Sequence, residues 1–368
     1  MAMALTVTGT VWLTMTGHLL LPFEQVTTLR GRLASISDFF EDPQVTRILR
    51  RHGLRVEAST AGSREVATGS LNGLDFVFPS GKSAADQIID AREEAKEYSR
   101  NFHPFVSPLV LASFREYAET LHDRDVAYPQ GASGGEQALY YTLDMDKFLS
   151  LTQQHLSWHD LQIGKYGFDN HSLVAAQTSD ICQSNSADSY LGLVAFTENH
   201  NAPPIESKSA RVLARSISSL LLSLGSASDS LYTYYVDRNG INRDPIAVLY
   251  EHQYLAYQAE YRAAHGTVDT ERVLLYPRFP MMSEPHFIAL NHKADRLGEL
   301  LETDPELRRR ETQLGYQLVP SGSDDALAEY LNGQGIPAPQ PSSREQTVAR
   351  MPDWQVLEQM IATIKKCP

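Results

Sequence analysis

The sequence has very few cysteines, and neither of them belongs to a metal-binding motif. Only Cys182 and Cys367 occur among 368 residues. No CxxC pair and no Cys/His pattern of a zinc site surrounds either one. Two interpretations remain open: a disulfide that ties the C-terminal region to the centre of the chain in an oxidising compartment, or two free thiols. We predict no bound cofactor and no metal site.

Positive charge is also scarce. The chain has 32 Lys and Arg against 45 Asp and Glu, which gives a formal net charge of −13. Nucleic-acid-binding surfaces usually carry a basic field, so we expect no nucleic-acid partner. With 42% hydrophobic residues the composition is that of a globular protein. The length suits about two domains with a substantial core.

Residues 1–23 contain no Asp, Glu, Lys or Arg. Their length suits one membrane crossing, but threonines interrupt the apolar pattern and no basic segment precedes it. We expect a signal anchor or an uncleaved export segment, so that the remainder is extracytoplasmic, either membrane-anchored or secreted. A buried core helix or a mis-assigned start is the alternative.

Beyond this segment, strand and helix patterns alternate. Strands are expected at residues 30–35, 54–59 and 74–78, each followed by a helix. A β–α order of this kind indicates an α/β fold with a mostly parallel sheet flanked by helices. A central stretch, residues 173–196, begins as an apolar strand, continues as a polar loop, and becomes a helix from about Asp188.

Small hydroxyl residues and glycines recur where the strands meet the following helices. The four junctions contain Ser35 and Ser37; Gly62 and Ser63; Ser80, Gly81 and Ser83; and Ser184, Asn185 and Ser186. Each junction presents N–H groups and hydroxyls at a positive helix end, which favours a carboxylate or an oxyanion. Because the carboxyl ends of parallel strands converge, we expect all four to line one ligand cleft. Helix capping is the alternative for each junction taken singly.

Four segments carry a resemblance to a known family. They are TAGSREVA at Thr60–Ala67, DFVFPSG at Asp75–Gly81, QTSDICQSNSADSYLGLVAF at Gln177–Phe196, and VLYEHQYL at Val248–Leu255. Through them the chain resembles extracellular solute-binding proteins of the type II periplasmic-binding fold, with an actinobacterial-type substrate-binding domain. The resemblance implies two lobes that close over a small polar solute, delivery of that solute to a membrane transporter, and no enzymatic activity.

The resemblance also implies a division of the chain. Residues 24–107 and 276–368 are expected to form lobe I, and residues 108–275 are expected to form lobe II. Each lobe is expected to be a mostly parallel sheet, and the strands at 107–114 and 274–290 are similar to the family's crossover strands.

Three further residues are candidates for ligand contact. Tyr250 and Glu251 follow an apolar strand and begin a helix, so both are predicted to reach the cleft. For Glu251 a favourable interaction with the helix dipole is an equal alternative. Arg64 is a candidate partner for an anionic ligand, with a solvated helix start as the alternative. Asp180 and Asp188 favour a cationic or hydroxylated ligand instead, so the charge of the ligand stays open.

Other classes of function find weaker support. Gly131–Gly135 matches the G-x-S-x-G spacing around Ser133, but no apolar strand leads into it, so an α/β serine hydrolase is the less favoured alternative. The Gly81-Lys82-Ser83 sequence is no phosphate loop, because Phe76 stands where its first glycine is required. A ligand-free interaction or sensor domain on the same fold is a further alternative. We expect the tyrosines of residues 232–235 to lie on a buried strand.

Overall fold

The computed structural model describes residues 26–131, 137–227, 231–237, 240–243, 245–319, 326–340 and 348–367. The expected N-terminal export segment and Ser133 lie outside these residues. Within the described ranges, no helix is both long and apolar enough to span a membrane.

Lobe I is built on a five-stranded sheet with the order β2-β1-β3-β13-β4. Its strands are β1 (Thr27–Leu33), β2 (Leu54–Thr60), β3 (Phe76–Phe78), β4 (Arg100–Phe102) and β13 (Phe287–Ala289). Its helices are α2 (Ser37–Glu41), α3 (Pro43–Arg51), α4 (Ser63–Thr68), α5 (Lys82–Glu94), α13 (Asp295–Thr303) and α14 (Pro305–Gln313). The first three strands are parallel, and β13 runs antiparallel to both of its neighbours.

Lobe II is built on a seven-stranded sheet around the long strand β5. Its strands are β5 (Phe105–Phe114), β6 (Ala127–Pro129), β7 (Tyr140–Leu143), β10 (Ile246–Tyr250), β11 (Arg272–Pro277), β12 (Met282–Ser283) and β14 (Gln317–Leu318). Its helices are α6 (Arg115–His122), α7 (Met145–Gln153), α8 (Asn185–Glu198), α9 (Ser207–Leu222), α10 (Leu231–Val236), α11 (Gly240–Arg243), α12 (Glu251–His265), α15 (Ala326–Gly333) and α16 (Trp354–Ile364). A 3-10 turn (Ile163–Tyr166) and the short pair β8 (Thr178–Ser179) and β9 (Ser226–Ala227) complete it.

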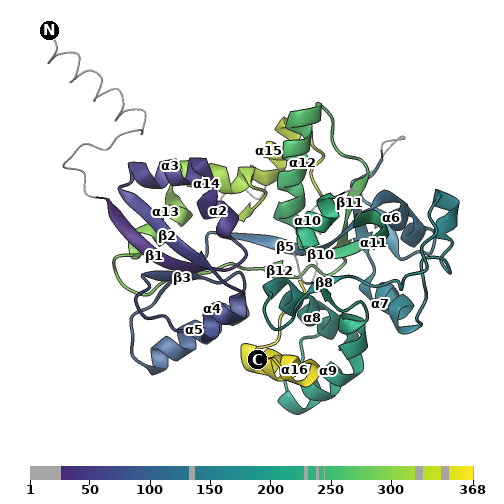
Figure 1. Cartoon of the computed structure of the whole chain (residues 1–368), viewed down its shortest axis with the longest axis horizontal. Coiled ribbons are helices and arrows are strands. Elements are labelled where there is room, and N and C mark those ends of the chain that lie inside the picture. Colours follow the sequence, from purple (N-terminus) through teal and green to yellow (C-terminus); the bar gives the residue numbers. More distant parts are fainter. Residues whose placement is uncertain are drawn as a thin grey trace, which may run out of the picture.

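The α/β class with two helix-flanked sheets is confirmed, but the expected mostly parallel sheets are instead mixed, and most strand pairs of lobe II are antiparallel. In lobe II, β5 runs antiparallel to β10 and β11, whereas β11 and β7 are parallel. Figure 1 shows the two lobes side by side, with the purple strands of lobe I separated from the green strands of lobe II.

The chain changes lobes between β4 and β5, again between β12 and β13, and a third time between α14 and β14. β12 pairs with β5 and β13 pairs with β4, so the first two connections run next to each other. The exact lobe boundaries stay a prediction. Buried residues of α16, however, join the core of lobe II, and the helix contacts α9 of lobe II and α5 of lobe I (Figure 1).

Aromatic side chains dominate the core of lobe I. The rings of Phe76 and Phe287 stack with centroids 4.8 Å apart, which joins β3 to β13. A Cβ atom at Gly31 would overlap the Phe76 ring, so the glycine on β1 makes this packing possible.

Three elements differ from the sequence-based expectation. The apolar strand expected at the start of residues 173–196 is wrong, because Leu173 makes only an isolated bridge to Ser157 and β8 begins at Thr178. The helix expected after the strand at residues 30–35 is divided into α2 and α3, because Asp42 accepts hydrogen bonds from the N–H groups of Gln44 and Val45 and starts a new helix. The expected strand at residues 232–235 is wrong, because these tyrosines lie in α10. Leu231 and Tyr235, four residues apart, are its buried face, and period-four burial is helical rather than extended.

A disulfide joins Cys182 to Cys367, with Cα atoms 5.3 Å apart. The bond links the loop before α8 to the segment after α16, and the sequence separation is 185 residues. Of the two interpretations left open by the sequence, a disulfide or two free thiols, the structure has the disulfide.

We expect replacement of both cysteines by serine to lower the free energy of unfolding by about 2–5 kcal/mol, because the disulfide restricts the unfolded chain over a long loop. Urea denaturation measures the change. Reducing agent should destabilise the wild type similarly and leave the variant unchanged. Equal urea midpoints for the oxidised wild type and the variant would contradict this expectation.

Candidate ligand-binding site

Loops from both lobes meet where three helices begin. In lobe I, Gly62 precedes α4 and Gly81 precedes α5, while Asn185 begins α8 in lobe II. A Cβ atom on Gly62 would overlap the carbonyl oxygen of Gln183, and one on Gly81 would overlap the Asn185 side chain. The absence of a side chain at both glycines thus allows direct contact between the lobes. We call this contact region the junction.

Ser80 is the centre of the hydrogen bonding at the junction. The Nδ2 of Asn185 donates to the Ser80 carbonyl oxygen at 3.1 Å and to the Tyr250 hydroxyl at 2.8 Å. Within lobe I, the Ser80 N–H donates to the Ser63 hydroxyl at 3.2 Å, and the Ser35 N–H donates to the Ser80 hydroxyl at 2.9 Å. Four of these five residues are buried, and only Ser35 is exposed. The structure therefore brings together residues of all four strand–helix connections that were predicted to line one cleft.

The three helices lack side-chain caps. The N-cap residues Gly62, Gly81 and Ser184 make no side-chain hydrogen bond to the first turns of α4, α5 and α8. Asp42 caps α3 and Asp304 caps α14, but α2, α6, α9, α13 and α16 also lack a side-chain cap. What sets α4, α5 and α8 apart is that their N-termini meet. The first turns of the three uncapped helices thus retain donor groups and partial positive charge, which favour an anion.

The two candidates at the start of α12 go to different places. Tyr250 contacts Asn185 at the junction, and burial raises the pKa of its hydroxyl to about 12. Glu251 accepts hydrogen bonds from the Tyr276 hydroxyl at 2.9 Å and from Gln317 at 2.7 Å. Burial raises the pKa of Glu251 to about 7. Its carboxylate belongs to a network with β11 and β14, and a role in ligand contact stays a prediction.

The remaining candidates make local contacts. Arg64 pairs with Glu358 of α16, with Nη2 and Oε2 2.5 Å apart. The hydroxyls of Ser184 and Ser186 lie 2.8 Å apart, and the Ser37 hydroxyl donates to its neighbour Asp38 at 3.5 Å. Ser83 is half-buried in the first turn of α5. Ligand contact by each of these side chains is a prediction still to be tested.

The two aspartates of the central loop have opposite properties. Both carboxylate oxygens of Asp180 accept hydrogen bonds from Lys365, at 2.8 and 2.9 Å. Burial raises the pKa of Asp180, but the lysine and the Cys182 N–H outweigh it and lower the value. Asp188 has a buried Oδ1 without a hydrogen-bond partner in the described structure. Burial raises its pKa to about 8, Glu358 adds to the rise, and Arg64 opposes it.

The C-terminal helix α16 covers one side of the junction, and the sequence analysis missed its role. Trp354 donates from Nε1 to Asp90 of α5 at 2.7 Å, and Glu358 pairs with Arg64 of α4. The following segment pairs Lys365 with Asp180. Cys367 was the only sequence signal that linked this region to the central loop.

Ser283 is a second residue that sequence reasoning missed. Its hydroxyl donates to the Ser80 carbonyl at 2.7 Å, beside the bond from Asn185. Ser283 lies in a proline-rich turn without any helix start, so the pattern that marked the other serines was absent.

Comparisons with known proteins agree with this architecture. No protein-family profile and no curated protein sequence matches the chain. Among solved structures, iron-bound HitA from Pseudomonas aeruginosa has a TM-score of 0.56 at 9% identity, over 92% of this chain and 99% of that one. The substrate-binding protein of an ABC transporter from Agrobacterium tumefaciens has a TM-score of 0.52 at 11% identity, over 94% and 96% of the two chains. The periplasmic binding protein P5PA has a TM-score of 0.50 at 10% identity, over 92% and 99%.

These similarities show the fold of this chain. It is the two-lobed type II periplasmic-binding fold, as the four sequence segments predicted. Of these three neighbours, one is described as a substrate-binding protein, one as a periplasmic binding protein and one as an iron-bound protein. The narrower likeness to an actinobacterial-type domain stays a prediction.

We expect Gly62→Ala to separate the lobes, because its Cβ would overlap backbone rather than a flexible side chain. Small-angle X-ray scattering should show a larger radius of gyration, and the free energy of unfolding should fall by about 1–3 kcal/mol. Gly164→Ala is the matched control, because nothing lies within 4 Å of a Cβ there. An unchanged radius and stability in Gly62→Ala would disprove the close approach.

We expect Asp188→Asn to stabilise the protein more at pH 8 than at pH 4.5. The pKa of Asp188 is about 8 in the folded chain against an ordinary 3.8, so folding takes up a proton between these values and stability falls as the pH rises. Asparagine cannot ionise, and the gain at pH 8 should exceed that at pH 4.5 by at least about 1.4 kcal/mol, the equivalent of one pKa unit.

Urea denaturation at the two pH values measures this difference. Asp180→Asn is the control, since its pKa is lowered and it should destabilise the protein at pH 8. The same gain for Asp188→Asn at both pH values would show that this carboxyl is not protonated in the folded state.

Proposed function

We propose that this protein is an extracytoplasmic solute-binding protein whose lobes close over a small polar solute, in particular an oxyanion or a carboxylate. The observation that carries the proposal is the meeting of three uncapped helix N-termini from both lobes at one junction. Donor groups from α4 and α5 on one side and α8 on the other can surround one anion.

Binding requires opening and closing of the junction. Asn185 bridges to Ser80 across the lobes, and this contact must break before a solute reaches the helix ends. The two adjacent chain crossings are the hinge about which the lobes move. A solute between the lobes then replaces the direct contact with its own hydrogen bonds, which stabilises the closed form.

Arg64 and Asp188 contribute unequally to an anion site. Arg64 already has Glu358 as its counter-ion, so it supplies little net positive charge. Asp188, with its pKa raised to about 8, carries a proton at neutral pH and can donate a hydrogen bond to an oxyanion. The dipoles of the helix ends therefore supply the main attraction.

Location and delivery are part of the same proposal. A disulfide suits an oxidising compartment, which agrees with export of the chain. Transfer of the solute to a membrane transporter is supported by likeness to the substrate-binding protein of an ABC transporter.

A second candidate is a ligand-free interaction or sensor domain. It is supported by the amount of protein already at the junction: Asn185 fills the space beside Gly81, and α16 bridges α5 and α9. In this case the closed arrangement would be the working state.

A thermal-shift screen of the full chain tests the proposal against sulfate, phosphate, small carboxylates, amino acids and sugars. A ligand at about 100 times its Kd adds roughly 2.7 kcal/mol to the free energy of unfolding and raises the Tm. We expect an oxyanion or a carboxylate to raise the Tm. In the Ser63→Ala and Ser186→Ala variants, at least a tenfold higher ligand concentration should be needed for the same rise in Tm.

The matched control is Ser216→Ala, whose exposed hydroxyl donates to the Leu213 carbonyl within α9. Sodium chloride at equal ionic strength controls for salt. A well-folded protein whose Tm no solute raises would overturn the proposal and favour the interaction domain.

A further inference from the structure

Three metal-ligating side chains gather where the chain passes between the lobes. His103 lies in the connection from β4 to β5, and Glu284 and His286 lie in the connection from β12 to β13. The flanking residues are paired: Ser283 with Ser107 on one side, and Phe287 with Phe102 on the other. The cluster therefore spans both strands of the hinge.

The donor atoms of the three residues are close to one another. One ligand atom from each lies within 4.8 Å of the other two. Glu284 Oε2 is 4.0 Å from His286 Nε2. The two imidazole rings stack with centroids 4.7 Å apart and an interplanar angle of 11°.

Both histidines have a buried ring nitrogen that makes no hydrogen bond in the described structure. These are the Nε2 atoms of His103 and His286, and His286 is only 7% exposed. The Nδ1 of His286 lies 3.1 Å from Oδ1 of Asn101. Because an amide oxygen accepts, Nδ1 carries the proton and Nε2 keeps its lone pair, which is the form that binds a metal. A buried lone pair without a donor costs free energy that a metal ion would recover.

One positive charge lies near the cluster. It is Lys82, which adds to burial in lowering the pKa of both histidines. Its ammonium is held by both carboxylate oxygens of Asp86, at 2.6 and 2.7 Å, which offsets the repulsion of a cation.

We propose that His103, Glu284 and His286 bind a divalent transition-metal ion of the Zn²⁺ type and so link the two strands of the hinge. Two imidazoles and one carboxylate suit Zn²⁺, with a fourth position for water, whereas Ca²⁺ and Mg²⁺ prefer oxygen ligands. Metal–ligand distances of about 2.0–2.2 Å place ligand atoms roughly 3.3 Å apart. The side chains therefore move closer on binding, and the stacked rings tilt toward each other.

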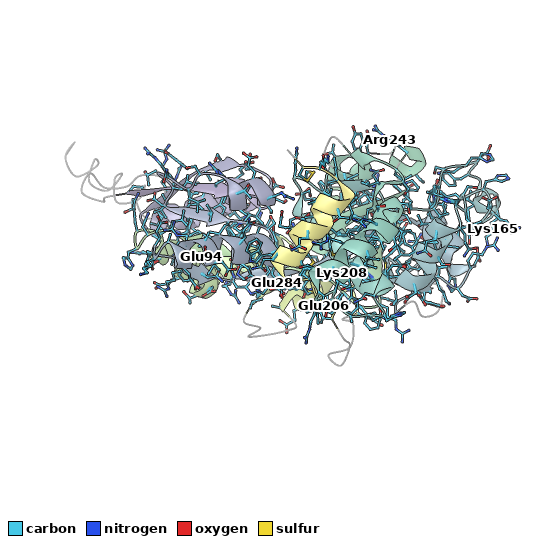
Figure 2. The ribbon with its side chains drawn as sticks, turned by 90° about the horizontal axis from the view of Figure 1, so that it is seen from below. Glu94, Lys165, Glu206, Lys208, Arg243 and Glu284 are labelled. Atoms are coloured by element: carbon cyan, nitrogen blue, oxygen red, sulfur yellow. A yellow bond between two sulfur atoms is a disulfide. The ribbon has the colours of Figure 1, made fainter. Side chains whose placement is uncertain are left out.

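The site is separate from the proposed solute site but adjacent to it. Ser283, next to Glu284, donates to the Ser80 carbonyl of the junction. Figure 2 places the labelled Glu284 between Glu94 of α5 and the labelled residues Glu206 and Lys208 at the start of α9. A metal at this position would restrain the movement that opens the junction.

A second cluster provides the control. His159, Asp169 and His171 of lobe II also lie within reach of one ion, but all three are exposed. Because His171 Nε2 already lies 3.0 Å from Asp169 Oδ1 and all three side chains face solvent, we expect only weak, unspecific metal binding here. Variants of this cluster test whether any measured binding belongs to surface histidines.

The experiment titrates the full chain, freed of metal by chelation, with Zn²⁺ in isothermal calorimetry and without added solute. We expect one ion per chain and a raised Tm. Co²⁺ in place of Zn²⁺ should give the visible absorption of a tetrahedral site. His103→Ala and Glu284→Gln change half-buried residues, and each should weaken binding at least tenfold while leaving the metal-free Tm and circular dichroism unchanged.

The His159→Ala/His171→Ala variant should bind as the wild type does. Hydrogen exchange should slow on Zn²⁺ addition at residues 101–107 and 281–287. The inference is overturned if Zn²⁺ binds equally well to His103→Ala and Glu284→Gln, or if the His159→Ala/His171→Ala variant abolishes binding. Because no solute is present, failure here leaves the proposed function untouched.

Discussion

The carbonyl oxygen of Ser80 accepts hydrogen bonds from two different parts of the chain. One comes from Asn185 at the start of α8 in lobe II, and the other comes from Ser283 beside the second hinge strand. The shared acceptor joins the end of β3, the hinge and the opposite lobe. The glycine that follows, Gly81, is required for the same contact, because any side chain there would displace Asn185. Closure and hinge position are therefore coupled through one backbone group.

The charges near the junction are almost all neutralised locally. Arg64 pairs with Glu358, Asp180 pairs with Lys365, and Asp188 is buried with its pKa raised to about 8. With side-chain charges paired or protonated, the helix ends dominate the local potential. The proposed anion site depends on this local balance, because the chain as a whole has a net charge of −13. The local arrangement of donors matters more than the total charge.

Much of lobe I could be predicted from sequence, because each strand there is followed by its helix at short distance. The strand at residues 54–59 and the helices after Gly62 and Gly81 appear close to their expected positions as β2, α4 and α5. These elements follow from local pattern and capping chemistry. The type II fold followed from four short segments that reappear at the junction and around it.

Parts of the site depended on long-range contacts that no local pattern records. The hydroxyl of Ser283 acts on a carbonyl 203 residues away. Glu251 comes directly after Tyr250, yet its carboxylate accepts hydrogen bonds from Tyr276 and Gln317 rather than reaching the junction. The hinge histidines escaped notice because His103 and His286 are 183 residues apart, and pairing of β4 with β13 is what brings them together. The tyrosines of residues 232–235 suggested a strand from their residue type, but they lie in the helix α10, so propensity alone did not decide their structure.

The disulfide between Cys182 and Cys367 has a consequence for the making of the protein. Its two halves are 185 residues apart, so Cys182 leaves the ribosome long before its partner. At about 5–20 residues per second, the interval lasts roughly 10–40 s. Through most of this time α9 is present without α16, which packs on it, and the core of lobe II lacks Leu357 and Ile361. The first strands of lobe I can form while lobe II is still incomplete. Until Cys367 is synthesised, the Cys182 thiol can form a disulfide with an incorrect thiol. Efficient production of this protein therefore depends on a compartment in which Cys182 stays reduced, or is reversibly paired, until α16 arrives.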